Sequence, residues 1–306
     1  MIQKLKLKYK ALAPISQIGE TASTGSYFNM VQTAYGKTPI VSANSMRGLL
    51  RDLMALHLLE SIGAVANDKD EFLALFSGGN TGATLKNDIK KAKEIRRLFP
   101  FLSIMGGCFG DMILDGKEKF KVGFLYPICK ENEDITEIES SISWHDLINE
   151  IEFTRTDDSK KDLLVEKYLK DIESDSTGKA SQQMRFSVQY LAIGTEFYQE
   201  LYINANSLEV GALMQGFQKF KEEPFIGGMS AKGFGKVELS LDLSSYQAEI
   251  QAYNDFLNKN KDEIIANLSL LKTSNPDKKE SAKNGKQTDE TIEDNSEDGG
   301  RQVVFE

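Results

Sequence analysis

Apolar and polar residues alternate along several short stretches of this chain, and in other stretches the apolar residues recur every three to four positions. In residues 5–11 every second side chain is apolar and lysines lie between them, which predicts a strand with one buried and one basic face. The same period of two predicts strands at 197–203 and 235–243, and a further strand, stopped by Pro127, is predicted at 119–128. The chain is therefore expected to form a sheet with one covered face.

Helical spacing separates these predicted strands. Apolar residues from Met46 to His57 follow one face of a helix, which Ser42 or Asn44 can cap. A second helix is predicted over 207–222, and a third over about 246–271. The order β-α-β-β-α-β predicts an α+β fold with a ferredoxin-like (RRM-like) core, in which helices cover one face of an antiparallel sheet.

The rest of the chain is assigned to insertions and a tail. We expect a single domain over 1–272, with large insertions at 13–41, 61–118 and 130–190. Residues 273–306 are polar and charged without apolar periodicity, so a disordered acidic tail is expected there.

Charge is distributed unevenly along the 306 residues. The net charge is −9, yet residues 1–51 carry seven basic groups and one acid. Residues 131–176 carry fifteen acids against five bases, and the tail is also acidic. Because the sign alternates by region, the overall charge does not exclude a nucleic-acid partner.

Other classes of protein are disfavoured by composition. No apolar run is long enough for a membrane span, and the first residues lack the apolar core of a signal peptide. Cys108 and Cys129 fit no metal-ligand spacing, and there are only two histidines. We therefore expect a cytoplasmic protein that uses no metal or other cofactor and does not bind membranes.

Residues 21–51 contain no Asp or Glu, although they include Lys37, Arg47 and Arg51. Arg47 is expected in the first helical turn, where the helix dipole disfavours a cation unless an anion is near. Arg51 follows four residues later, so both side chains are expected on one helix face. Together with free N–H groups at the helix N-terminus, they form a candidate phosphate site. The alternative is that both arginines pair with acids on an insertion.

A second acid-free segment, 225–237, contains four glycines and two lysines before the last predicted strand. Successive N–H groups in such a segment can bind an anion, although the spacing fits neither a P-loop nor a dinucleotide-binding turn. An ordinary glycine-rich turn is the alternative. The basic residues of 85–98 are interpreted as a solvated helix face, and 106–110 as a tight turn.

Signals for catalysis are weak. His57 falls on the apolar face of its helix, which is typical of a core histidine, and His145 has no partner in sequence. Metal-assisted hydrolysis needs acids beside the bound phosphate. Since the two phosphate-like segments are free of acids, no nuclease activity is expected.

Two motifs resemble a known family. TPIVSANSMRGLLRDL (Thr38–Leu53) is similar to the first-helix signature of the RAMP superfamily of CRISPR proteins, and PFIGGMSAKGFGKVEL (Pro224–Leu239) to its C-terminal glycine-rich motif. The nearest resemblance is to the seventh Cas family, the backbone subunit of effector complexes, in its type IV or type I-D branch.

The resemblance implies a subunit that polymerises head to tail along guide (CRISPR) RNA, beside other effector subunits, and presents the spacer for pairing with a target nucleic acid. It implies a β-hairpin thumb within 153–185 that displaces a guide base at intervals. Carried onto this sequence, the implied RNA-binding residues are Asn44, Ser45, Arg47, Arg51, Gly228, Ser230, Lys232 and Gly233, with Arg155, Met184 and Arg185 in the thumb.

The resemblance also bears on cleavage. Type III members cut target RNA with an aspartate between the first strand and first helix, and this sequence has no acid from Thr21 to Arg51. A binding subunit without its own nuclease activity is expected. The alternatives are a RAMP-type endoribonuclease that processes the CRISPR transcript, with His57 as general base, and an interaction protein whose acidic middle binds a basic partner.

Overall fold

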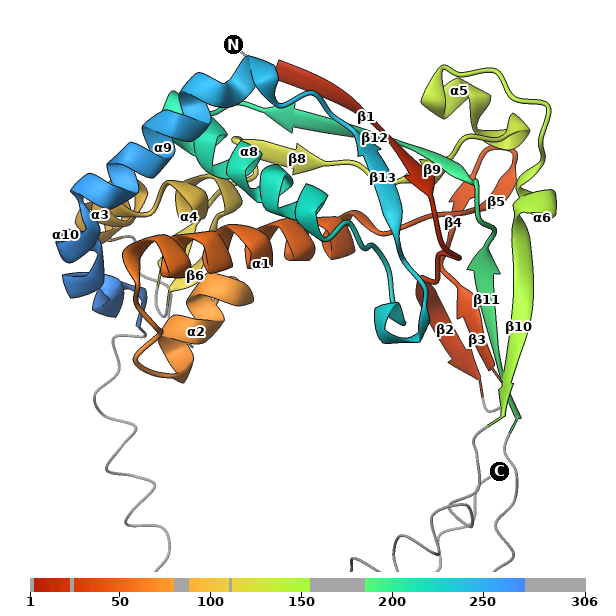
Figure 1. Ribbon diagram of the computed structural model, residues 1–306, viewed down its shortest axis with the longest axis horizontal. Coiled ribbons are helices and arrows are strands. Elements are labelled where there is room, and N and C mark those ends of the chain that lie inside the picture. The colour runs from red at the N-terminus through yellow and green to blue at the C-terminus, as the bar shows by residue number, and fades with distance from the viewer. Residues whose placement is uncertain (1–2, 23–24, 80–87, 110–111, 155–184, 273–306) are drawn as a thin grey trace, which may run out of the picture.

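The computed structural model describes residues 3–22, 25–79, 88–109, 112–154 and 185–272. They form a mixed α and β structure with several antiparallel sheets. The main sheet lies along the top of an arch, with a group of helices at one end and a second sheet at the other (Figure 1).

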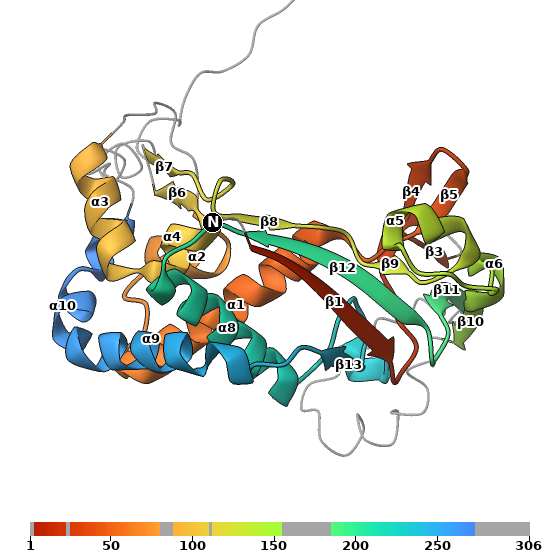
Figure 2. The ribbon, with the colours of Figure 1, turned by 90° about the horizontal axis from the view of Figure 1, so that it is seen from above.

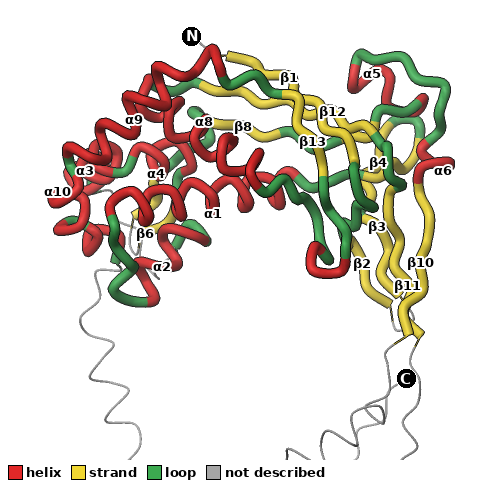
Figure 3. Tube along the Cα trace, viewed as in Figure 1, coloured by secondary structure: helices red, strands yellow, loops and turns green. Residues whose placement is uncertain are grey.

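The main sheet joins strands that are far apart in sequence. Its order is β13-β1-β12-β8, every neighbouring pair is antiparallel, and β9 extends the same edge by pairing with β12. Figure 3 shows these strands crossing the top of the molecule. The strands are β1 (Gln3–Ala11), β8 (Phe120–Val122), β9 (Tyr126–Pro127), β12 (Glu196–Ile203) and β13 (Val237–Ser240).

Helices cover one face of this sheet, and the other face is open, as the view from above shows (Figure 2). The covering helices are α1 (Ala43–Ile62), α8 (Ser207–Glu222) and α9 (Gln247–Lys259). The alternation of β1 places Leu7 and Tyr9 in the core, where the Tyr9 ring meets the Phe220 ring edge-on at 6.2 Å. A capping box at Asn206 and Glu209 starts α8.

Smaller elements extend the helical end of the arch. Arg51 of α1 and the start of α8 both contact the short helix α4, so this end packs directly onto the main helices. The elements are α2 (Lys69–Phe76), α3 (Ile89–Leu98), α4 (Pro100–Met105), the paired strands β6 (Gly107–Phe109) and β7 (Met112–Leu114), α10 (Lys261–Ala266) and the 3₁₀ helix η5 (Leu268–Leu271).

The second sheet has the order β10-β11-β3-β2, in which β11 and β3 are parallel. Its strands are β2 (Ile18–Ala22), β3 (Gly25–Phe28), β10 (Ile148–Thr154) and β11 (Arg185–Leu191). Beside it lie β4 (Met30–Thr33) paired with β5 (Gly36–Pro39), the 3₁₀ helix η1 (Lys130–Asn132), α5 (Glu133–Thr136) and α6 (Trp144–Leu147).

Residues 14–16 join the two sheets. Ile15 and Leu191 of β11 exchange two backbone hydrogen bonds, of 3.0 and 2.8 Å. Pro14 O and Ser16 O accept from backbone N–H groups of the glycine-rich segment that precedes β13. This short stretch therefore connects β1, the second sheet and the glycine-rich segment.

Most predicted elements are confirmed, with three corrections. The predicted strand 119–128 is wrong as a single element, because Gly123 N donates to Glu200 O and the chain leaves the ladder between β8 and β9. The predicted strand 235–243 is shorter, since only β13 pairs. The predicted helix 246–271 divides at Asn260 and again at Asn267 into α9, α10 and η5. The predicted tail at 273–306 lies outside the described residues.

Candidate nucleic-acid interface

The N-terminus of α1 opens into a cavity of about 500 Å³, called here the α1 cavity. Ser42 caps the helix, because its Oγ accepts from Ser45 N at 3.2 Å, and the first turn carries no acidic side chain. Asn44 and Arg47 line the cavity from the helix side. Its other walls contribute two lysines, Lys117 and Lys121. The predicted acid-free helix start therefore does face a hollow in the surface.

Arg47 and Arg51 both bind backbone carbonyls at the end of α4. Arg47 donates from Nη2 to Met105 O at 2.5 Å and from Nη1 to Phe120 O at 3.0 Å. Arg51 donates from Nη2 to Gly106 O at 2.8 Å and to Met105 O at 3.3 Å. Terminal carbonyls of a helix carry partial negative charge, so they attract cations. Neither arginine forms an ion pair with a carboxylate in the described part of the chain.

The two arginines differ in burial. Arg51 is only 8% exposed and its Nη1 has no hydrogen-bond partner among the described residues, whereas Arg47 is half-buried beside the cavity. Burial, and then the neighbouring charge of Arg47, lower the pKa of Arg51 to about 10. Burial also lowers the pKa of Arg47. Arg51 therefore stays charged at neutral pH, and both guanidinium groups place positive charge at this wall of the cavity without an ion pair to a described carboxylate.

The glycine-rich segment forms a separate exposed loop. Its 3₁₀ helix η3 (Ser230–Lys232) begins after Met229, a non-glycine residue at φ +64°, and ends at Gly233, at φ +85°. Gly228 N donates to Ser16 O at 2.7 Å, which ties the loop to the junction of the sheets. Strained backbone of this kind is concentrated at functional sites.

Lys232 contacts the second sheet and not α1. Its Nζ lies 5.5 Å from the centre of the Phe153 ring on β10, and Phe153 in turn lies 6.2 Å from the Phe234 ring. In Figure 1 the loop lies on the same side of the main sheet as α1. However, none of the described contacts joins it to Arg47, and none of its residues lines the α1 cavity. The two predicted phosphate sites are therefore two separate surfaces in the described structure.

The predicted thumb lies largely outside the described residues, and so do Arg155 and Met184. The strands on either side of it are described. They pair in register, with Thr154 opposite Arg185. Arg185 is exposed, and its Nη1 lies 4.0 Å from Glu152.

The lysines on the open face of the main sheet are partly neutralised. Lys4 pairs with Glu200 at 2.7 Å and Lys6 pairs with Glu137. Tyr198 and Tyr202 also donate to Glu200, at 2.5 and 2.8 Å. Partial burial alone would raise the pKa of Glu200, but the hydrogen bonds from Lys4 and the two tyrosines hold it at about 2. This face therefore offers less free positive charge than the sequence of β1 suggests.

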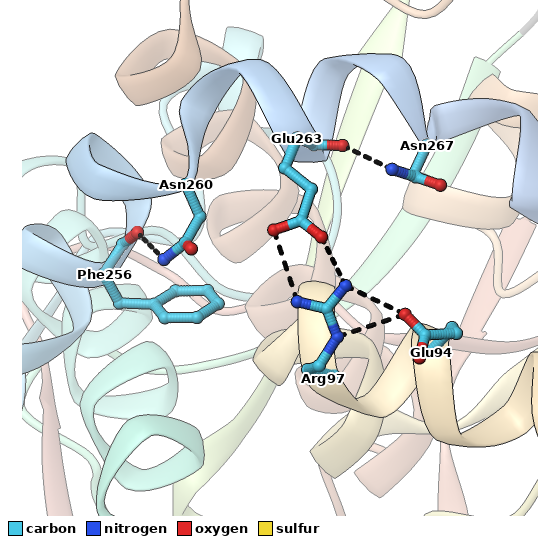
Figure 4. Close-up of polar contacts among 6 residues, drawn as sticks. All are labelled: Glu94, Arg97, Phe256, Asn260, Glu263 and Asn267. Atoms are coloured by element: carbon cyan, nitrogen blue, oxygen red, sulfur yellow. Dashed lines mark hydrogen bonds and ion pairs between the residues drawn. The ribbon is translucent and has the colours of Figure 1, made fainter.

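The basic helix α3 mainly stabilises the fold. Arg97 bridges Glu94 of the same helix and Glu263 of α10, as Figure 4 shows, which raises the pKa of Arg97. Arg96 donates to Asp115 O at 3.3 Å, and Lys91 donates to two further backbone carbonyls. These contacts account for much of its basic face without a nucleic-acid ligand.

His57 lies between α1 and α9. Its Nε2 is 2.9 Å from Asn254 Oδ1 and 3.3 Å from Ser61 Oγ. Burial lowers the pKa of His57, and the residue does not line the α1 cavity. His57 is half-buried at a helix contact and not part of the buried core, so the predicted core position is only approximate.

Sequence reasoning missed Lys117 and Lys121 as residues of the α1 cavity. The alternation of Lys117, Lys119 and Lys121 is a signal that could have found them. Lys119 makes an internal ion pair with the buried Glu209, whereas Lys121 is exposed and has no ion pair in the described structure. Asp115 also lines the cavity, 3.5 Å from Lys117.

The structure also bears on metal binding and membrane spans, both of which the composition disfavours. The described residues contain no group of three or more His, Cys, Asp or Glu side chains arranged to hold a metal ion. None of their helices combines the length and the hydropathy that crossing a bilayer requires.

Comparisons with known proteins give a likeness in fold. No protein-family model matches the sequence, and no curated protein matches it either. Among solved structures, a chain described as "Type IV-B CRISPR Complex" is similar at a TM-score of 0.55 and 15% sequence identity. The match covers 79% of this chain and 92% of that one. At this identity the likeness shows that the two chains share a fold.

Proposed function

We propose that this chain is a guide-RNA-binding backbone subunit of a CRISPR effector complex. It polymerises head to tail along the spacer, beside other effector subunits, and presents the guide for pairing with a target nucleic acid. The fold that it shares with a chain of a Type IV-B CRISPR complex supports this proposal, as does its resemblance to the RAMP superfamily.

We infer that the main sheet with α1 and α8 is a ferredoxin-like core. Counting only the strands predicted from sequence, the sheet has the order fourth, first, third, second, and one helix follows the first strand and another the third. On this interpretation the second sheet and the helical end of the arch are insertions. The paired strands β10 and β11 form the base of the thumb.

The α1 cavity is the observation that carries the proposal. A phosphate in this cavity meets the free N–H groups of a long helix without an acid in its first turn. It also meets Asn44, Lys121 and the charge of Arg47. The buried Arg51 adds positive potential and also binds Met105 O, one of the two carbonyls that hold Arg47. We assign direct phosphate contact to the exposed groups and a supporting role to Arg51.

The glycine-rich loop provides a second contact to the RNA backbone. Gly228, Ser230, Lys232 and Gly233 are accessible there, and Lys232 has no ion pair in the described part of the chain. Because Lys232 lies over Phe153 of β10, RNA bound to the loop also lies next to the base of the thumb. Two separate basic surfaces suit an extended strand better than a single small anion.

Charge reversal at one exposed lysine of each surface tests the proposal. Lys121→Glu and Lys232→Glu change side chains that make no ion pair within the described ranges, so the fold should be retained. The double variant should no longer co-purify with RNA. Each single variant should reduce the steepness with which the logarithm of RNA affinity falls against the logarithm of salt concentration, by about 1 for each phosphate that is no longer bound. Lys69→Glu, at the exposed start of α2, is the matched control for charge. Normal RNA binding by the double variant would contradict the proposal.

A further inference from the structure

A second cavity, of about 590 Å³, lies at the other end of the arch. It is bordered by the second sheet, the β4–β5 hairpin and α6, and none of the expected RNA-binding residues lines it. We call it the Trp144 cavity; its principal lining residues are Tyr27, Asn29, Lys37, Trp144, His145 and Gln189. These residues come from segments distant in sequence, so only the fold brings them together.

Aromatic rings form one wall of the Trp144 cavity. The rings of Trp144 and His145 are stacked, with centroids 3.7 Å apart and planes at 28°. Trp144 is half-buried, His145 is exposed, and Tyr27 is 46% exposed. Flat rings that remain accessible in a cavity are the platforms on which proteins stack nucleobases.

Two side-chain amides of the cavity, those of Gln189 and Asn29, have polar groups without a hydrogen-bond partner among the described residues. Gln189 Oε1 accepts from Phe28 N at 3.1 Å, which directs the side-chain NH₂ elsewhere, and that group has no partner among the described residues. The Asn29 side chain makes no hydrogen bond in the same part of the structure. Donors and acceptors of this kind match the edges of a base.

Charge in the cavity suits a nucleotide and not an isolated phosphate. Lys37 is exposed and has no ion pair within the described ranges, so it can bind a backbone phosphate. Glu20 also lines the cavity and would repel that phosphate, but its carboxylate can accept from the exocyclic amino group of a base. A ring wall, two amides and one charge of each sign are the complement of a nucleotide with its base inserted.

We propose that the Trp144 cavity holds one nucleobase of a single RNA strand, stacked on the Trp144–His145 pair, with Lys37 at the adjoining phosphate. This inference rests on the proposed function, because it supposes that the chain binds RNA. It adds a site for a base at a place separate from both phosphate surfaces.

Trp144 is the only tryptophan in the sequence, so its fluorescence reports on this cavity alone. RNA-free protein is titrated with a short single-stranded RNA, and tryptophan emission is recorded beside the anisotropy of a label on the RNA. Stacking should quench the emission. An abasic backbone of the same length should raise the anisotropy without quenching, because it carries phosphates and no bases.

Variants of the cavity test whether the quenching of tryptophan emission arises there. Lys37→Ala and Tyr27→Ala alter exposed side chains, so the fold should persist, and each should raise the RNA concentration at half-quenching by roughly threefold or more. Lys69→Ala should leave that concentration unchanged. Equal half-quenching concentrations in the wild type and in both cavity variants would overturn the inference.

Outcomes for the two proposals separate cleanly. RNA binding by anisotropy without quenching overturns the base site and leaves the proposed function standing. If no RNA binds, the proposed function fails. Titration with the four nucleoside monophosphates then tests whether the Trp144 cavity binds a base. Quenching by any of them supports a base site, and no quenching by all four overturns it.

Discussion

Arg47 and Arg51 donate hydrogen bonds to the same backbone oxygen, Met105 O, at 2.5 and 3.3 Å. Two like charges converge on one helix end because its carbonyls face α1 and no described carboxylate competes for them. The pair links the start of α1 to the end of α4, and it keeps positive charge beside the α1 cavity. The contacts that join the two helices therefore also set the charge at the proposed phosphate site.

Replacing Arg51 with methionine should destabilise the fold. The change keeps most of the side-chain volume but removes the hydrogen-bond donor of Gly106 O, the carbonyl of a buried residue, so we expect the free energy of unfolding to fall by about 1–3 kcal/mol. Urea denaturation measures the change. Arg47→Met, at a half-buried position, should have a smaller effect, and equal stability of Arg51→Met and wild type would contradict the role assigned to Arg51.

Two glycines should respond to alanine in opposite directions. A Cβ at Gly48, within α1, meets no atom within 4 Å, so Gly48→Ala should raise the free energy of unfolding by about 0.5–1 kcal/mol. A Cβ at Gly211 would lie 2.1 Å from Glu249 O, so Gly211→Ala should force α8 and α9 apart. The free energy of unfolding should then fall by about 1–3 kcal/mol.

The same denaturation series tests both glycine variants. A loss of stability in Gly48→Ala would show that the space beside α1 is filled, and an unchanged Gly211→Ala would show that α8 and α9 are not in close contact. RNA affinity of Gly48→Ala adds a second readout. It should fall if the RNA backbone approaches the helix at this open position.

Stability in acid should depend on Glu200. Its folded-state pKa of about 2 is lower than the unfolded value, so the unfolded chain binds more protons in this range and stability is lost as pH falls from about 4.5 toward 2. Glu200→Gln should flatten the dependence of unfolding free energy on pH in that window. Glu196→Gln, on the same strand, is the control, and an unaltered pH profile in Glu200→Gln would contradict the assignment.

His57 should be dispensable for RNA chemistry. Since it packs between α1 and α9 and bonds Asn254, His57→Gln should leave repeat RNA as intact as wild type does, as gel analysis after incubation would show. Burial lowers the pKa of His57, so the unfolded chain binds more protons below about pH 6.5 and stability falls there. His57→Gln should remove that slope. Specific cleavage by wild type that the variant lacks would favour the endoribonuclease alternative.

Local pattern predicted those elements whose burial repeats regularly along the chain. The alternation from Leu5 to Ala11 and the helical spacing after Met46 each reflect one covered face, so β1 and α1 were predictable. The break between β8 and β9 at Gly123 was not predictable, because it depends on a hydrogen bond to Glu200, which is far away in sequence. The parallel pairing of β11 with β3 likewise leaves no local trace.

Some features of the candidate site could likewise be predicted from local sequence, and others could not. That Arg47 and Arg51 share a helix face follows from their spacing of four, and the structure confirms it. Their carbonyl partners lie more than fifty residues away, so the sequence suggested free phosphate ligands or acidic partners instead. The Trp144 cavity was beyond local reasoning, because its walls come from residues 19–37, 144–148 and 189.

The junction at Pro14–Ser16 has a mechanical consequence. Since this stretch bonds both β11 and the glycine-rich loop, a pull on β11 is transmitted to the loop through three consecutive residues. The direct contacts of Phe234 with Phe153 and Tyr190 form a second route between the same two parts of the molecule.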